Sequence, residues 1–74
     1  MSTLNIQKTG TCCRVIGLQG DSHFLSRIIA IGLTPGCEVE ILRNRKRQPL
    51  ILFARDSMIA LSRKESENIL IKAL

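Results

Sequence analysis

Hydrophobic residues recur along the chain with two different periods, and the change of period marks a corner in the fold. Leu25, Ile28 and Ile29 are spaced by three and four residues, which is typical of the buried face of a helix. Over residues 37–42, apolar and acidic positions alternate, which is typical of a strand with one buried face. The pattern therefore predicts a helix over residues 22–31 that is followed by a strand over residues 37–42.

The segment that joins these two elements has the composition of a helix end followed by a turn. Gly32 can adopt a positive φ without a Cβ clash, so it can end the helix, and Leu33 can then fold back onto Ile28. Pro35 presets φ at the second position of a turn, and Gly36 supplies the positive φ of a type II turn at the third. We expect the chain to reverse here and the sheet to begin.

Other apolar runs predict short strands over residues 12–18, 50–54, 58–61 and 69–71. Ser62 and Glu65 form a capping-box pattern, which predicts one helical turn before the last strand.

The predicted elements favour a mostly β fold in a single domain. Residues 1–10 are polar and mixed, so we expect an N-terminal segment there, either a loose terminus or a short first strand, and the domain itself over residues 11–74. About five short strands in so small a domain favour an SH3-like barrel, closed or partly closed, because closure hides strand edges. One helix is inserted after the first strand, and a short helical turn precedes the last.

The charge balance indicates an acidic or anionic partner. The chain of 74 residues carries a formal net charge of +5. Arg43, Arg45, Lys46 and Arg47 lie in the polar connection between two predicted strands, and we expect them to contact a partner. The favoured partner is an acidic protein surface, with nucleic acid or lipid headgroups as alternatives. A solvated loop without a partner would have the same composition.

Aromatic residues are scarce, which narrows these alternatives. The chain has two phenylalanines and neither tryptophan nor tyrosine. Single-stranded nucleic acid would find few side chains on which to stack its bases, so nucleic acid is the disfavoured partner.

A second candidate contact is the corner itself. Leu33, Thr34 and Pro35 would form a rigid, partly apolar knob, which could insert into a partner at little entropic cost. A purely structural turn explains the same residues, so both interpretations stay open.

The residue sets that catalysis requires are missing from the sequence. His23 is the only histidine, and the six carboxylates are dispersed. We expect no enzymatic activity, no cofactor and no small-molecule substrate. Cys12 and Cys13 should point to opposite faces of a strand, so we expect neither a metal site nor a disulfide between them.

Length and hydropathy suggest the setting in which the protein works. A chain of this size has a thin core, so a partner or a weak homo-oligomer would add burial. We see no apolar run long enough for a membrane span and no signal-peptide pattern, and we therefore expect a cytoplasmic protein.

Two parts of the chain resemble a known family. Residues 25–42, LSRIIAIGLTPGCEVEIL, resemble the central signature of FeoA, a small accessory protein of bacterial ferrous-iron uptake. The sequence from Pro49 onward, with MIALSRKE at 58–65 and ILI at 69–71, resembles the second half of that family. The resemblance runs from about Thr11 to the end.

The resemblance implies an SH3-like barrel without catalysis or a required cofactor. It implies a cytoplasmic protein that binds FeoB, a membrane ferrous-iron transporter with an N-terminal GTPase domain, and so lies at the inner membrane. Related domains occur at the C-terminus of iron-dependent repressors. A nucleic-acid-binding or metal-dependent regulatory module is therefore the alternative. The strongly basic hairpin departs from the family pattern and keeps that alternative open, whereas the lack of a helix-turn-helix pattern favours the accessory protein.

Overall fold

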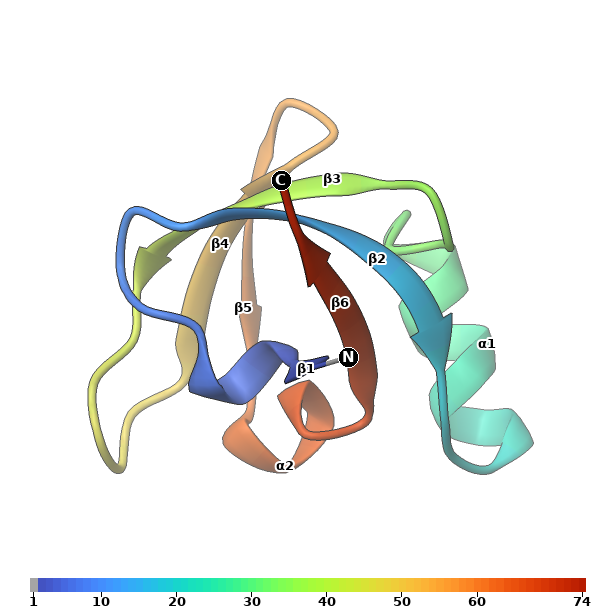
Figure 1. Ribbon diagram of the computed structural model, residues 1–74. Coiled ribbons are helices and arrows are strands. Elements are labelled where there is room, and N and C mark those ends of the chain that lie inside the picture. The colour runs from blue at the N-terminus through green and yellow to red at the C-terminus, as the bar shows by residue number, and fades with distance from the viewer. Residues whose placement is uncertain (1) are drawn as a thin grey trace.

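The computed structural model describes residues 2–74 and consists of one bent antiparallel sheet with a helix at its side (Figure 1). The elements in chain order are β1 (Ser2–Thr3), the 3₁₀ helix η1 (Leu4–Ile6), β2 (Cys12–Leu18), α1 (Ser22–Ala30), β3 (Glu38–Arg43), β4 (Leu50–Ala54), β5 (Ser57–Leu61), α2 (Arg63–Ser66) and β6 (Ile69–Ala73).

The six strands are arranged in the order β1-β6-β2-β3-β4-β5, and every neighbouring pair is antiparallel. Register shifts at Val15/Gly17 and at Ile41/Arg43 mark irregularities of the kind that bend strands. The prediction of a small, mostly β, SH3-like fold with an inserted helix and a late helical turn is confirmed. The sheet itself stays open, because β1 and β5 are its two edges and do not pair with each other.

The core lies inside the bend of the sheet and follows the alternation of the strands. Its fully buried large side chains come from nearly every element and include Val15, Ile28, Leu33, Ile41, Leu50, Leu52, Leu61, Ile69 and Ile71. Leu4 of η1 is also fully buried, and β1 pairs with β6. The described part of the N-terminal segment thus contains a short first strand and contributes a side chain to the same core.

The corner after α1 forms as its sequence predicts. Asp21 caps the start of α1 by accepting a hydrogen bond from the Phe24 backbone N–H. At the other end, the Gly32 N–H donates to the Ile29 carbonyl and the Leu33 N–H to the Ile28 carbonyl, which is a Schellman motif. The Cys37 N–H then donates to the Thr34 carbonyl and closes the turn, with Gly36 at φ +96°.

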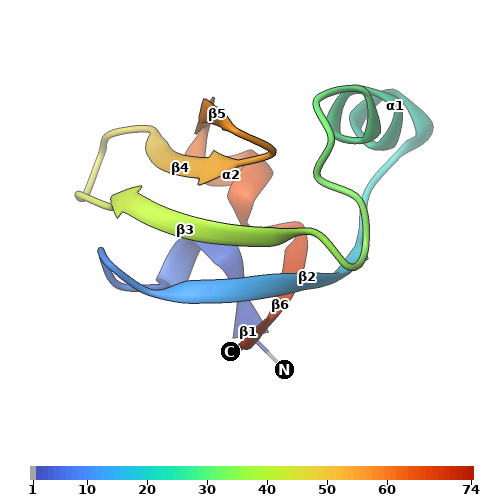
Figure 2. The ribbon, with the colours of Figure 1, turned by 90° about the horizontal axis from the view of Figure 1, so that it is seen from above.

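Only one side of α1 is packed. Ile28 is fully buried and Phe24 packs partly against the core, but Ile29 is 52% exposed. The expectation that Ile29 belongs to the buried face is wrong, because α1 lies beside the sheet and presents much of its surface outward (Figure 2). Arg27 is exposed on α1 and forms an ion pair with Glu65 of α2.

The capping box at α2 is confirmed. The Ser62 hydroxyl accepts a hydrogen bond from the Glu65 N–H, and the Glu65 carboxylate accepts one from the Ser62 N–H. The same Glu65 carboxylate pairs with Arg27, so this short helix also ties α1 to the rest of the domain.

Candidate partner-binding surfaces

The corner between α1 and β3 is rigid, but it is not an apolar knob. Leu33 is fully buried in the core, so its expected role as an exposed anchor is wrong: it closes the Schellman motif from inside. Thr34 is half-buried and Pro35 is exposed, so these two alone remain available to a partner.

A residue that sequence reasoning missed holds this corner in place. Arg55 lies in the two-residue turn between β4 and β5, where it and Asp56 both have a positive φ. Its Nε donates to the Gly32 carbonyl at 3.3 Å, and its Nη2 donates to the Thr34 hydroxyl at 3.3 Å. No local pattern links positions 32 and 55, so only the fold reveals this contact.

The basic residues of the β3–β4 connection are all exposed, as expected for a contact surface. Arg43 ends β3, and Arg45, Lys46 and Arg47 follow in the loop. We call these four residues the basic loop. None of them takes part in either of the two ion pairs found among residues 2–74, which join Arg14 to Glu38 and Arg27 to Glu65.

The backbone of the basic loop is held by two buried or half-buried polar groups. Nη1 of Arg63 donates to the Arg45 and Gln48 carbonyls at 3.0 and 3.2 Å, and its Nη2 donates to the Asn5 carbonyl at 3.0 Å. The Asn44 side-chain amide donates to the carbonyls of Asn5 and Gln7. The loop is therefore tied both to α2 and to the N-terminal segment.

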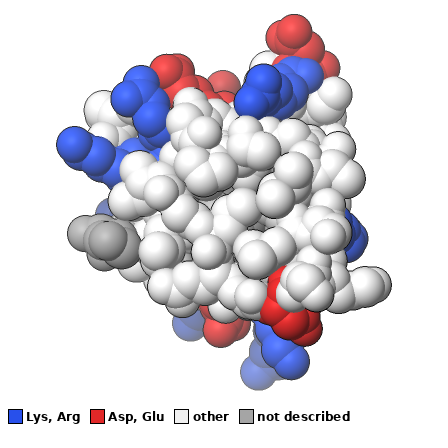
Figure 3. All heavy atoms as spheres, turned by 90° about the vertical axis from the view of Figure 1, so that its right-hand side faces the viewer, with Lys and Arg blue, Asp and Glu red and all other residues white. Residues whose placement is uncertain are grey.

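A face with few charges lies on the opposite side of the molecule. Figure 3 looks at the molecule from the side of α1, and the middle of this surface carries no Lys, Arg, Asp or Glu, which gather at its margin. The exposed residues of α1 other than Arg27 are Ser22, His23, Ser26, Ile29 and Ala30. We call these five residues the α1 face.

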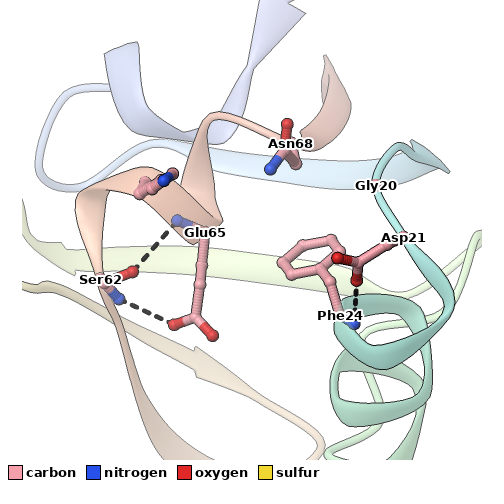
Figure 4. A pocket seen from close by; sticks show the side chains of 7 residues that line it. Gly20, Asp21, Phe24, Ser62, Glu65 and Asn68 are labelled. Atoms are coloured by element: carbon pink, nitrogen blue, oxygen red, sulfur yellow. Dashed lines mark hydrogen bonds between the residues drawn. The ribbon is translucent and has the colours of Figure 1, made fainter.

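A groove borders the α1 face where α1 begins. It has a volume of about 590 Å³ and is lined by Gly20, Asp21, Phe24, Ser62, Lys64, Glu65 and Asn68. The Phe24 ring points from α1 into the space toward Glu65, and both acidic side chains have partners, since Asp21 caps α1 and Glu65 caps α2 (Figure 4). The groove thus offers an apolar ring between two acidic groups that already have partners.

The chain matches the model of a known protein family. The model of the FeoA domain matches residues 2–73, which is nearly the whole chain. The chain belongs to the FeoA family. This confirms the resemblance noted in the sequence and places the protein in a family that is associated with ferrous-iron transport.

Solved structures agree with this assignment. A crystal structure of an iron uptake regulatory protein, FeoA, is 19% identical, with a TM-score of 0.93 and coverage of 97% of this chain and 96% of that one. The FeoA of Stenotrophomonas maltophilia, an SH3 domain protein in complex with zinc, is also 19% identical, with a TM-score of 0.85 and coverage of 97% and 91%. No curated protein sequence matches the chain.

The same fold occurs within larger regulators. A manganese-dependent transcriptional repressor is 15% identical, with a TM-score of 0.92 over 99% of this chain but only 36% of the repressor. At this identity the likeness shows the shared fold alone.

Cys12 and Cys13 of this FeoA domain differ in their exposure to solvent. Cys12 is exposed, in a hollow of about 320 Å³ that Glu40 and Phe53 also line, whereas Cys13 is buried. Burial, with a smaller contribution from Cys12, raises the pKa of the Cys13 thiol to about 11, so Cys13 stays protonated at neutral pH and is a poor metal ligand. Among residues 2–74, no three His, Cys, Asp or Glu side chains are grouped so that they could hold a metal ion.

The two α-helices of the domain are short, with nine and four residues. In the part of the chain described by the structure, no helix is long and apolar enough to cross a membrane.

Proposed function

We propose that this protein is a non-catalytic, cytoplasmic accessory factor of ferrous-iron uptake that binds the FeoB transporter. Membership of the FeoA family supports a role in this process, and the S. maltophilia relative has been suggested as an activating factor for bacterial ferrous-iron transport. The proposal requires no cofactor or small-molecule substrate, because the protein acts through surface contact.

The observation that carries the proposal is the α1 face. A surface that carries few charges and exposes a large apolar side chain beside a groove is a candidate protein-binding site. Ile29 lies on this face, and the exposed Pro35 follows α1 at the corner that Arg55 braces. Because the helix is capped at both ends and tied to α2, the face is preformed, and binding FeoB costs little ordering of the chain.

The test uses a strain that lacks this protein and measures Fe²⁺ uptake together with co-purification of FeoB. Ile29→Lys places a charge in the α1 face while keeping good helix propensity, so it should restore neither uptake nor co-purification. Met58→Lys is the matched control, because Met58 is 71% exposed on β5 and lies outside the α1 face.

Both variants must first give the circular dichroism spectrum and unfolding midpoint of the native protein. If Ile29→Lys restores uptake and co-purification fully, the α1 face is not the docking surface. If neither the native protein nor any variant co-purifies with FeoB, the partnership itself is refuted.

A nucleic-acid-binding or metal-dependent regulatory role is the second candidate. It is favoured by the fold shared with the manganese-dependent repressor and by the basic loop. Binding to nucleic acid predicts an affinity that falls steeply with salt and weakens when the loop is neutralised. The absence of such binding at low salt would eliminate the nucleic-acid role.

A further inference from the structure

The basic loop is an uncompensated concentration of positive charge at one end of the molecule. Residues 1–20 and 41–55 contain no aspartate or glutamate. These two stretches supply the basic loop and the N-terminal segment beside it, which adds Lys8. A cluster of this kind attracts anions, because no neighbouring carboxylate in the sequence offsets it.

The cluster is held in shape before it meets a ligand. Arg63 binds the Arg45 and Gln48 carbonyls from inside the loop, so the loop backbone is fixed while its side chains stay free. Since the backbone is already ordered, binding restricts little beyond the side chains themselves.

An exposed apolar side chain lies next to the charges. Ile6 is 64% exposed at the end of η1. The Asn44 amide donates to the carbonyls of Asn5 and Gln7, the residues on either side of Ile6, so the backbone at Ile6 is held beside the start of the loop. Lys8 follows two residues later and is exposed. Cations and an apolar side chain therefore share one end of the molecule.

We infer that this end of the molecule is a docking site for the anionic phospholipid headgroups of a membrane surface. Cationic side chains bind headgroup phosphates, and an exposed apolar side chain beside them can enter the boundary with the acyl chains. Nucleic acid would use the cations but not Ile6, and the loop offers no aromatic ring for stacking. The combination of charge and an apolar side chain favours lipid.

The lipid site is separate from the α1 face. The β3–β4 loop and α1 lie at opposite sides of the molecule in Figure 1, and the view in Figure 2 agrees. One molecule could therefore contact a membrane through the loop while its α1 face stays open. The inference goes beyond the proposed function, because lipid binding requires no FeoB.

The experiment measures co-sedimentation of the purified protein with vesicles, in the absence of FeoB. Vesicles of phosphatidylcholine alone are compared with vesicles in which about a third of the lipid is phosphatidylglycerol. We expect binding only to the anionic vesicles, at roughly 0.1–1 mM lipid, with an affinity that falls as salt rises. Equal binding to both vesicles, or no binding at low salt, would overturn the inference.

Matched variants locate the site. Arg45→Gln/Lys46→Gln should weaken vesicle binding about 25-fold, since each cation at an anionic surface contributes about fivefold. Arg14→Gln/Lys72→Gln removes the same net charge from β2 and β6, away from the loop, and should change binding less than about twofold. If the two double variants lose binding equally, the attraction is a property of net charge and the site is refuted.

Ile6→Ser separates lipid from nucleic acid. It should weaken vesicle binding several-fold, because it removes the apolar contact, and leave binding to a single-stranded oligonucleotide unchanged. Should the protein bind the oligonucleotide through the loop but not the vesicles, the anion that the loop recognises is nucleic acid and the lipid inference fails.

Discussion

Replacement of Gly32 by alanine tests whether backbone geometry at the corner limits the stability of the domain. Gly32 has a φ of +96°, where an L-residue is strained by about 1–2 kcal/mol. Alanine also lowers the entropy of the unfolded chain, which offsets about 0.4–1 kcal/mol of that loss. We therefore expect Gly32→Ala to lower the free energy of unfolding by about 1 kcal/mol, and Gly32→Val to lower it further, since valine is β-branched.

Gly36 provides a matched control. It has the same φ of +96°, but a Cβ added there meets no atom within 4 Å, whereas a Cβ at position 32 would lie 3.3 Å from the Cγ of Arg55. The Arg55 side chain is flexible and can move, so the two alanine variants should lose nearly equal stability. A much larger loss for Gly32→Ala would mean that the contact with Arg55, and not the backbone, sets the cost.

Urea unfolding followed by circular dichroism measures both variants, since the chain has no tryptophan for fluorescence. A loss of about 1 kcal/mol corresponds to a fall of roughly 4–8 °C in the thermal midpoint for a domain of this size. An unchanged midpoint for Gly32→Ala, with an unchanged m-value, would refute the assignment of Gly32 to the end of α1.

Two further predictions concern interactions that the fold creates. Arg63→Met should lower the free energy of unfolding by about 2 kcal/mol and speed amide exchange in the β3–β4 loop, because it removes three hydrogen bonds from the guanidinium to backbone carbonyls. Lys64→Met, on the same helix, should do neither. Burial raises the pKa of the Cys13 thiol to about 11 in the folded state. In the unfolded state the thiol has a pKa of about 8.5, so the unfolded state loses this proton at a lower pH. Stability should therefore fall as pH rises between these values, and Cys13→Ala should reduce that fall; an identical pH dependence in both proteins would contradict the assignment.

Several of the confirmed sequence predictions rest on short-range contacts. The Schellman motif at Gly32 and the capping box of Ser62 with Glu65 each join residues no more than five positions apart. Such interactions depend on the backbone conformation of a few neighbouring residues, so local residue types are enough to predict them.

The errors concern burial. Periodicity placed Ile29 on the buried face of the helix, but it is 52% exposed. Leu33 was a candidate for an exposed knob, but it is fully buried, in line with its predicted fold-back onto Ile28. Periodicity shows which residues share a face of a helix, but not how much of that face the rest of the chain covers. Because α1 lies beside the sheet, most of its surface stays exposed (Figure 2). Leu33, which follows the Gly32 that ends α1, lies in the core.

Local residue types were enough to predict the ends of α1 and α2, the turns and the predominance of short strands, because these features depend on neighbouring residues. The surfaces that a partner can reach became visible only in the folded molecule. Arg63 reaches a carbonyl 58 positions away at Asn5, and Arg55 braces a corner 23 positions away at Gly32. Hydrogen bonds to backbone carbonyls place no demand on the residue type of the acceptor, so nothing in the sequence marks these partners, and only folding brings them together.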